Sequence, residues 1–157
     1  MRWVRASYDD LFVSACSGGN SDLVEWLISY TENLGQKIDI HSGQDCAFWT
    51  ACYRGHKDCA TYLINIGERS YGKISLHRDD ESVFRIVCKN GNLSLAKWLI
   101  ELGEESYGKI DIHALGDAAF KSAYEEGHFD LTNWLIKLGQ GSYGLIPQAL
   151  IDTTSFV

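Results

Sequence analysis

The cysteines and histidines of this sequence of 157 residues recur at a spacing that could serve metal or redox chemistry. The residues that share a step of 36 are Cys16, Cys52 and Cys88 among the cysteines, and His41, His77 and His113 among the histidines. Zinc is held in proteins by thiolate and imidazole ligands, and cysteine thiols also carry redox chemistry. One hypothesis is therefore a metal-binding or redox protein that uses these two columns of side chains.

The same step runs through the apolar residues and the glycines, so it describes the whole chain. The columns are Phe12, Phe48, Phe84 and Phe120; Gly19, Gly55, Gly91 and Gly127; Trp26, Tyr62, Trp98 and Trp134; Leu27, Leu63, Leu99 and Leu135; and Ile28, Ile64, Ile100 and Ile136. Such a period is the signature of stacked repeats. We expect one domain, residues 1–157, with repeats over about 6–41, 42–77, 78–113 and 114–149 and a cap or tail over 150–157.

Each repeat contains the pattern of two amphipathic helices followed by an extended return. In the third copy, Phe84 and Val87 recur at helical spacing, and Leu95 and Leu99 do so in a second segment. The string KIDIH at 109–113 then alternates polar and apolar residues, which is typical of an extended segment. Each unit is therefore predicted to be a helix-turn-helix pair with an extended, β-turn-like connecting finger.

Glycines mark the expected ends of the second helices. Gly67, Gly103 and Gly139 follow these helices, where a left-handed residue is often needed. The first copy has Thr31 at this position and Gly35 four residues later. We therefore expect left-handed backbone at the three glycines, and about one extra turn in the first long helix.

The sequence allows more than one structure for its C-terminal segment and for one column of tyrosines. Residues 147–157 could form a capping helix that starts at Pro147, a frayed tail or the start of a longer array. Tyr71, Tyr107 and Tyr143 either cover the ends of the helices or form an exposed aromatic row.

The repeat resembles the ankyrin repeat. The strings that carry the resemblance are ACYRGHKD at 51–58, IDIH at 110–113 and GHFDLTNWLIKLG at 127–139. The resemblance covers about residues 9–148 and implies an all-α, ankyrin-type solenoid of four repeats. The unit departs from the family in its degenerate Thr-Pro-Leu-His motif and in its length, which is about 33 residues in the family. A tetratricopeptide array, the competing fold, lacks an extended segment between units.

A longer string points to a subfamily. WLIELGEESYGKIDIH at 98–113 resembles the large families of ankyrin-repeat proteins encoded by giant DNA viruses of amoebae, which are mimivirus-like. Ankyrin proteins bind other proteins through the finger tips and the concave face of the first helices. The resemblance therefore implies a non-enzymatic protein-protein interaction module, in this case a viral factor whose partner is a host protein.

Stacking argues against metal or redox chemistry in the two columns. Equivalent helices pack about 8–10 Å apart, whereas zinc holds sulfur at about 2.3 Å and a disulfide needs Cα atoms within about 7 Å. We expect the cysteines to fill the core, the three histidines of the column to hydrogen-bond in turns, and His56 and His128 to tie the loops between helices. The aromatic column that begins at Trp26 is also expected in the core between repeats.

Catalytic signatures are missing from the sequence. The pairs Gly72-Lys73 and Gly108-Lys109 are followed by isoleucine, whereas a phosphate-binding loop needs serine or threonine there. No HExxH pair and no GxSxG elbow occurs. We therefore expect no enzymatic activity, no cofactor and no metal.

Charge and composition narrow the class of partner. The formal net charge is −7, with no basic run, which argues against nucleic acid and against an anionic membrane surface. No apolar run approaches the about 20 residues of a membrane span, and the N-terminus lacks the apolar core of a signal peptide. Five cysteines without a CxxC pair suit a reducing compartment. We expect a monomeric protein of the cytoplasm, or of the host cell if the chain is viral.

Residues that vary between copies are the candidates for partner binding. They lie just before or directly after the phenylalanine of a repeat, or just before its glycine. Trp, Tyr and Arg among them are the residue types that dominate interface hot spots. The candidates are Gln44, Asp45, Trp49, Tyr53, Arg54, Asp79, Asp80, Glu81, Arg85, Lys89, Asn90, Leu115, Asp117, Lys121, Glu125 and Glu126. The acidic fingers favour a partner with some basic surface.

Overall fold

The computed structural model describes the backbone of residues 2–154 and the side chains of residues 8–152. Over the described backbone the chain forms helices, turns and irregular segments, and no strand, so the prediction of an all-α chain is confirmed. The helices divide into two compact units, Met1–Ser75 (unit 1) and Leu76–Val157 (unit 2). Each unit contains two helix pairs of the kind that the repeat predicts.

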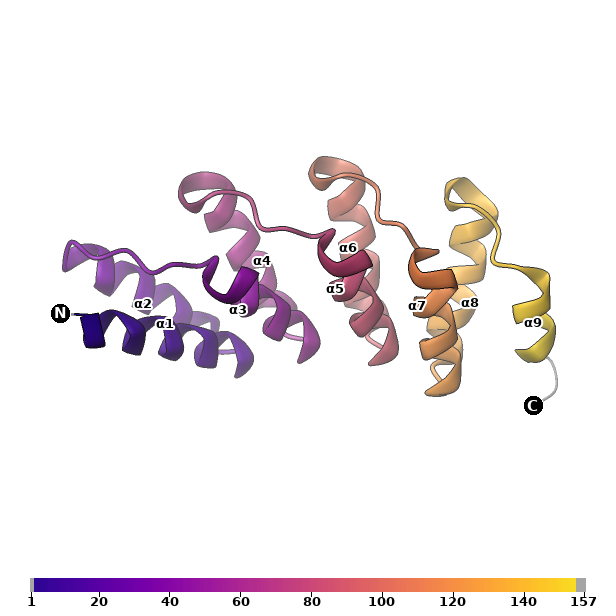
Figure 1. Cartoon of the computed structure of the whole chain (residues 1–157), viewed down its shortest axis with the longest axis horizontal. Helices are drawn as coiled ribbons and strands as arrows, with labels where there is room; N and C mark the ends of the chain where they lie inside the picture. The colour runs from indigo at the N-terminus through magenta and orange to yellow at the C-terminus, as the bar shows by residue number, and fades with distance from the viewer. Residues whose placement is uncertain (1, 155–157) are drawn as a thin grey trace. The chain divides into compact units, whose positions relative to one another are not determined.

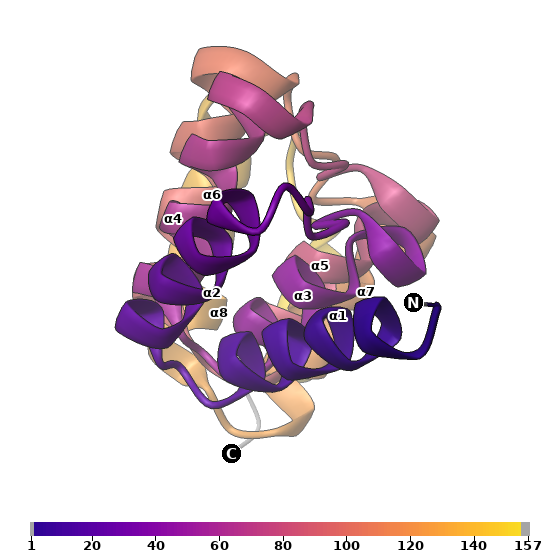
Figure 2. The ribbon, with the colours of Figure 1, turned by 90° about the vertical axis from the view of Figure 1, so that its left-hand side faces the viewer.

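Unit 1 is a stack of two helix pairs. It contains α1 (Arg2–Ser17), α2 (Ser21–Asn33), α3 (Ser42–Tyr53), α4 (Lys57–Ile66) and the π-helical turn η1 (Gly67–Tyr71). Helix α1 packs against α2 and α3, and α4 packs against α2 and α3. Figure 2 shows α1 and α3 in one layer of this unit and α2 and α4 in the other.

Unit 2 repeats this arrangement. It contains α5 (Arg78–Lys89), α6 (Leu93–Leu102), the π-helical turn η2 (Gly103–Tyr107), α7 (Ala114–Glu125), α8 (Phe129–Leu138), the turn η3 (Gly139–Tyr143) and α9 (Gln148–Thr154). Helix α5 packs against α6 and α7, and α7 packs against α8. Irregular segments carry the chain from η2 to α7 and from η3 to α9 (Figure 1).

The C-terminal segment is helical where it is described. Helix α9 begins after Pro147, whose carbonyl accepts the N–H of Leu150 at 2.9 Å. This agrees with the helix alternative for residues 148–154, and residues 155–157 lie outside the described part.

The phenylalanine and leucine columns form the core, as the repeat predicts. Each of Phe12, Phe48, Phe84 and Phe120 is 1% exposed, and the leucine column is buried as completely. Burying one such side chain stabilises the fold by about 1.5–3 kcal/mol. The alternation in the connecting segments is also confirmed, because Ile110 and Ile112 are buried while Lys109 and Asp111 are exposed.

The aromatic column is not a core column, which corrects the sequence analysis. Trp26 is 54% exposed, and Tyr62, Trp98 and Trp134 are half-buried. The ring of Trp26 instead stacks on Tyr30 at 4.8 Å between ring centroids on the outer side of α2. The leucine that follows each aromatic residue is buried instead. Adjacent helical residues point about 100° apart, so the aromatic position lies at the edge of the inward face while the leucine lies within it.

The glycines after the second helices are helical, not left-handed. Gly67, Gly103 and Gly139 have φ between −62° and −57° and open the π-helical turns. Glycine is needed there for space, because a Cβ on Gly67 would lie 2.8 Å from the carbonyl oxygen of Gly72. The left-handed residue comes five positions later, at Gly72 with φ 99°.

The first repeat ends its second helix differently, as predicted. Helix α2 has 13 residues and α4 has 10, so α2 runs about one turn further. Thr31 stands at the glycine position, and its buried hydroxyl donates to the carbonyl of Leu27 at 2.9 Å. The side chain of Asn20 accepts the N–H of Leu23 at 3.0 Å and so caps the start of α2.

The loops between paired helices are tied by histidines. His56 Nε2 lies 3.0 Å from the carbonyl oxygen of Ser17, in agreement with its predicted role. In unit 2 the ring of His128 lies against Gly91, so closely that a Cβ on Gly91 would be 2.4 Å from His128 Nδ1. Gly91 also has φ 71°, so both its backbone and its neighbour require glycine.

Candidate functional site

Helices α3, α5 and α7 each begin with three residues of left-handed backbone. The residues are Gly43, Gln44 and Asp45; Asp79, Asp80 and Glu81; and Leu115, Gly116 and Asp117, with φ between 49° and 64°. We call these three segments the left-handed turns. A residue other than glycine costs about 1–2 kcal/mol in this conformation, so the surrounding structure must hold each turn in place.

Leu115 offers a direct test of this strain. Its φ is 53° and its side chain is 60% exposed, so little contact is lost when the side chain is removed. We expect Leu115→Gly to raise the free energy of unfolding by about 1 kcal/mol in urea denaturation. The matched control is Lys97→Gly, an exposed residue in the regular helix α6, which should lower it by about 1 kcal/mol. A loss of stability in both variants would show that Leu115 is not left-handed.

A histidine and a carboxylate hold each left-handed turn. In unit 1, His41 Nδ1 lies 2.6 Å from Asp45 Oδ1, and His41 Nε2 lies 3.0 Å from the carbonyl oxygen of Tyr71. The second oxygen of Asp45 accepts the backbone N–H of Ser75 at 3.0 Å. The carboxylate therefore joins the turn both to its own histidine and to the segment that follows α4 and η1, at the end of the same helix pair. We call this arrangement the histidine clamp.

Unit 2 contains two further clamps. His77 Nδ1 lies 2.7 Å from Glu81 Oε1, and the same oxygen accepts the N–H of Asp111 at 3.2 Å. His113 makes the corresponding contact with Asp117, and its Nε2 lies 3.1 Å from the carbonyl oxygen of Tyr143. The prediction that the histidine column hydrogen-bonds in turns is confirmed.

Each clamp histidine faces an acceptor at both ring nitrogens, since His77 Nε2 also lies 2.9 Å from a carbonyl oxygen, that of Tyr107. A carboxylate and a carbonyl oxygen can only accept, so the geometry requires a proton on Nδ1 and another on Nε2. For His77, the hydrogen bond to Glu81 raises the pKa of the imidazole above its usual value. For His41 and His113, burial lowers the pKa, but the hydrogen bonds to Asp45 and Asp117 outweigh it and the net shift is upward. The two acceptors and the upward shift of the pKa both favour the imidazolium-carboxylate form of the clamp.

The stability of the chain should depend on pH through these pairs. A histidine whose pKa is raised on folding contributes stability below its unfolded pKa of about 6.5 and loses it as the pH rises through the folded pKa. We expect the free energy of unfolding to fall as the pH rises from 6 past neutrality. Urea denaturation of the full chain at several pH values measures this, and proton NMR of the histidine rings checks the direction of the shifts.

The neutral variant is the control for the pH experiment. The triple variant Asp45→Asn, Glu81→Gln, Asp117→Asn keeps a hydrogen-bonding side chain at each clamp but removes the charge. Its stability should change less over the same pH range. An unchanged pH slope in this variant would mean that the clamps do not carry the effect.

Three of the acidic residues predicted to bind a partner are buried in the clamps and are not available at the surface. Asp45, Glu81 and Asp117 are 9%, 6% and 7% exposed, because each side chain turns inward toward its histidine. Their spacing contained a signal for this role. The three acids recur at a step of 36, each four residues after a histidine of the column.

Arg85, another candidate for partner binding, forms hydrogen bonds within the protein. Its Nε donates to the carbonyl of Asp80 at 2.8 Å and its Nη2 to the carbonyl of Asp79 at 2.9 Å, so it supports the left-handed turn of α5. The side chain is half-buried. We interpret Arg85 as a positioning residue for the turn.

The remaining candidates lie on exposed surface in each unit. In unit 1, Gln44 lies in the turn of α3, and Trp49, Tyr53 and Arg54 follow it along the helix. The rings of Trp49 and Tyr53 stack at 5.2 Å and 7°, and the Arg54 guanidinium lies 5.7 Å from the Tyr53 ring. Trp49 is half-buried, whereas Tyr53 and Arg54 are exposed. The structure thus brings these three side chains together as one aromatic-cationic cluster.

In unit 2 the exposed candidates are polar or charged, apart from Leu115. Asp79, Asp80 and Leu115 lie in the left-handed turns, and the ends of the helices carry Lys89, Asn90, Glu125 and Glu126, with Lys121 between them on α7. Asp79 pairs with Arg78 at 2.8 Å. This unit has no counterpart of the Trp49-Tyr53 stack on α5 or α7, where Arg85 and Lys121 take the tryptophan position.

The tyrosines of the π-helical turns cover helix ends. The Tyr71 hydroxyl donates to Glu32 at 2.8 Å, and Lys37 Nζ lies 4.0 Å above the Tyr71 ring. Lys37 also donates to the carbonyl of Ser70 at 2.8 Å. In unit 2, Tyr143, Glu104, Lys109 and Ser142 repeat all three contacts. Of the two alternatives for this column, the covering role holds for Tyr71 and Tyr143.

Four of the five cysteines are core residues as predicted, whereas Cys46 is half-buried in α3 and not part of the core. Cys16, Cys52, Cys59 and Cys88 are buried, and all five cysteines are free thiols. Burial raises the pKa of the Cys16 thiol to about 12, and burial raises the pKa of Cys52 and Cys88 as well. A protonated, buried thiol is a poor nucleophile and a poor metal ligand. Among the described side chains, no group of three His, Cys, Asp or Glu residues is arranged to hold a metal ion.

Comparison of the chain with protein-family models, with curated proteins and with solved structures finds no match. The function is therefore argued from the residues of this chain. None of the helices over the described residues combines the length and the apolar character that crossing a bilayer requires.

Proposed function

We propose that the chain is a non-enzymatic protein-interaction module built from ankyrin-type repeats. The observation that carries this proposal is the set of left-handed turns, each strained and each held by a histidine clamp. Strained backbone that the rest of a fold maintains is concentrated at functional positions. The clamps point inward, so the residues that vary between copies are left on the outside of each turn.

Preorganised turns suit the binding of a protein surface. A loop that is already fixed loses little conformational entropy when a partner binds. Gln44 in unit 1 and Asp79, Asp80 and Leu115 in unit 2 are presented in this way. The turns therefore resemble the finger tips of ankyrin proteins in position, although their left-handed backbone is a feature of this chain.

The aromatic-cationic cluster of unit 1 is the strongest anchor for a partner. Trp, Tyr and Arg are enriched at the few positions that dominate interface energies. Tyr53 is 40% exposed, and its ring stacks on Trp49 and lies near the Arg54 guanidinium, so it is held by its neighbours yet accessible to a partner. We propose that this cluster contacts an intracellular protein, which is a host protein if the resemblance to viral ankyrin proteins holds.

The double variant Trp49→Ala, Arg54→Ala tests the proposal. The partner is captured from a host-cell lysate and identified by mass spectrometry. We expect the amount captured by the double variant to fall at least about tenfold, because the loss of one hot-spot residue costs about 1.4 kcal/mol or more of binding free energy. The thermal unfolding transition should stay close to that of the unaltered chain, because Arg54 is exposed, Trp49 is half-buried and neither belongs to the buried core.

The matched control is Trp26→Ala, Arg69→Ala. It removes the same two residue types from exposed positions in α2 and η1 of the same unit. This control should retain the partner. Equal capture by the two double variants and the unaltered chain would overturn the assignment of the cluster.

A further inference from the structure

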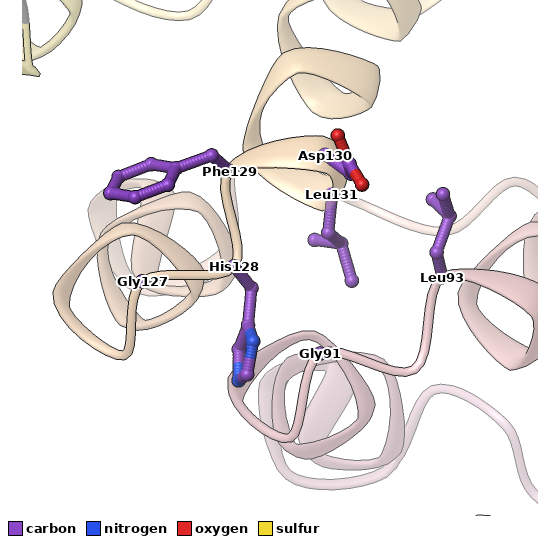
Figure 3. A pocket seen from close by; sticks show the side chains of 7 residues that line it. All are labelled: Gly91, Leu93, Gly127, His128, Phe129, Asp130 and Leu131. Atoms are coloured by element: carbon purple, nitrogen blue, oxygen red, sulfur yellow. The ribbon is translucent and has the colours of Figure 1, made fainter.

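Unit 2 contains a pocket that the binding residues described above do not line. The pocket lies where the loop between α5 and α6 meets the loop between α7 and α8. Figure 3 shows Leu93, Leu131 and the ring of His128 around the hollow, with Gly91 at its base and Asp130 at its rim. Its volume is about 380 Å³, at the small end of ligand pockets, which suits an amino-acid side chain better than a cofactor.

The apolar walls of the pocket are specific to the third and fourth repeats. The positions of Leu93, Phe129 and Leu131 correspond, two repeats earlier, to Ser21, Lys57 and Cys59 of unit 1. In both units a histidine ring lies against a glycine, at Gly19 and His56 in unit 1 and at Gly91 and His128 in unit 2. The same backbone therefore carries a small or polar residue at each of these places in unit 1 and an apolar wall in unit 2.

The carboxylate at the rim of the pocket in unit 2 has no neighbouring lysine of the kind that its counterpart in unit 1 has. Asp130 corresponds to Asp58, and Phe129 replaces the lysine that adjoins Asp58 in unit 1. Asp130 is exposed and makes no ion pair with the described side chains of the chain. Glu125 and Glu126 end α7 directly before this loop, and the lysine at the facing end of α5 is Lys89. Among the residues that line the pocket, Asp130 carries the carboxylate and none is a lysine or an arginine.

We propose that this pocket binds an arginine side chain of the partner protein. The aliphatic stem lies against Leu93 and Leu131, and the guanidinium pairs with the Asp130 carboxylate, which it can engage with two hydrogen bonds. The exposed Phe129 ring points away from the hollow and contacts Tyr124 edge-on at 5.9 Å between ring centroids, so the arginine side chain is recognised by the two leucines and Asp130 (Figure 3). This inference rests on the proposed function and names one residue type that the partner presents.

A small probe tests the pocket without the partner. N-acetyl-arginine amide is titrated into the full chain while NMR follows the methyl groups of Leu93 and Leu131 and the ring of His128. We expect saturable shifts at these groups. The isosteric neutral probe, N-acetyl-citrulline amide, should bind at least about tenfold more weakly, because it cannot form the charged pair.

Variants locate the site of binding. Asp130→Asn should weaken arginine binding about tenfold, and Phe129→Lys, which restores the residue of unit 1, should weaken it by at least as much. The matched control Asp58→Asn removes the corresponding carboxylate of unit 1 and should leave binding unchanged. Equal binding of the arginine and citrulline probes, tighter binding of N-acetyl-leucine amide, or unchanged binding by Asp130→Asn would each overturn the proposal.

The result is separable from the proposed function. If the arginine probe does not bind but Trp49→Ala, Arg54→Ala still loses the partner, the pocket proposal fails and the interaction module stands. If the probe binds as expected while the double variant retains the partner, the pocket proposal stands and the assignment of the aromatic-cationic cluster fails.

Discussion

Replacing Asp45 by alanine should lower the free energy of unfolding by about 3 kcal/mol. The carboxylate accepts from His41 and from the backbone of Ser75, and it is 9% exposed. Removing it leaves an imidazolium and an N–H without their partner, and breaking a buried ion pair from one side costs about 3–5 kcal/mol. The partial exposure of His41 places the expected cost at the lower end. Urea denaturation of the full chain measures the change.

A second substitution separates the clamp from the strain of the turn. Asp45 has φ 62°, which glycine adopts without the steric cost that alanine carries. The free energy of unfolding of Asp45→Gly should therefore be about 1 kcal/mol higher than that of Asp45→Ala. Both variants should remain less stable than the unaltered chain, because both lack the carboxylate. A cost below about 1 kcal/mol for both variants would mean that the clamp does not hold the turn.

Replacing Gly91 by alanine should also destabilise the chain by about 3 kcal/mol. Left-handed backbone at φ 71° costs about 1–2 kcal/mol for alanine. The added Cβ would lie 2.4 Å from His128 Nδ1 and 2.6 Å from its Cγ, so the whole ring must move. Overpacking of this kind costs about 1–3 kcal/mol. Thermal and urea denaturation give the magnitude.

Gly127 is the matched control for Gly91. It occupies the same place one repeat later and has φ 79°, but a Cβ there would meet nothing within 4 Å. Gly127→Ala should therefore show the backbone cost alone. His128→Ala should reduce the cost of Gly91→Ala to the same level. Equal costs at Gly91 and Gly127 would contradict the contact between the ring and the glycine.

The core and the clamps could be predicted from the sequence because burial and hydrogen bonding follow the repeat. The phenylalanine and leucine columns, which include Phe84 and Leu99, have the same residue in every copy and are buried. The histidine column hydrogen-bonds in turns as expected. The cysteines were predicted as core residues for the same reason. Asp45, Glu81 and Asp117 were assigned to the surface because acids are usually exposed, although their spacing from the histidines indicated the pairs.

Backbone conformation could not be predicted in the same way. Gly67 was expected to be left-handed because a left-handed glycine often follows the last turn of a helix. Its backbone is helical instead, and glycine is needed there because a Cβ would lie too close to the carbonyl oxygen of Gly72. The left-handed turns were missed because residues such as Leu115 and Asp80 rarely adopt this conformation, and the contacts that hold them come from distant parts of the chain. Trp26 was misplaced because its position is adjacent to a core column and only the helical rotation decides which residue faces inward.

The affinity of the captured partner for the full chain and for the two double variants decides whether the aromatic-cationic cluster is the binding surface. Isothermal titration calorimetry gives the dissociation constant for each. We expect Trp49→Ala, Arg54→Ala to raise this constant at least about tenfold, and Trp26→Ala, Arg69→Ala to leave it within about twofold of the unaltered value. The same dissociation constant for all three proteins, with unchanged thermal unfolding, would contradict the claim that the chain binds proteins through the aromatic-cationic cluster of unit 1.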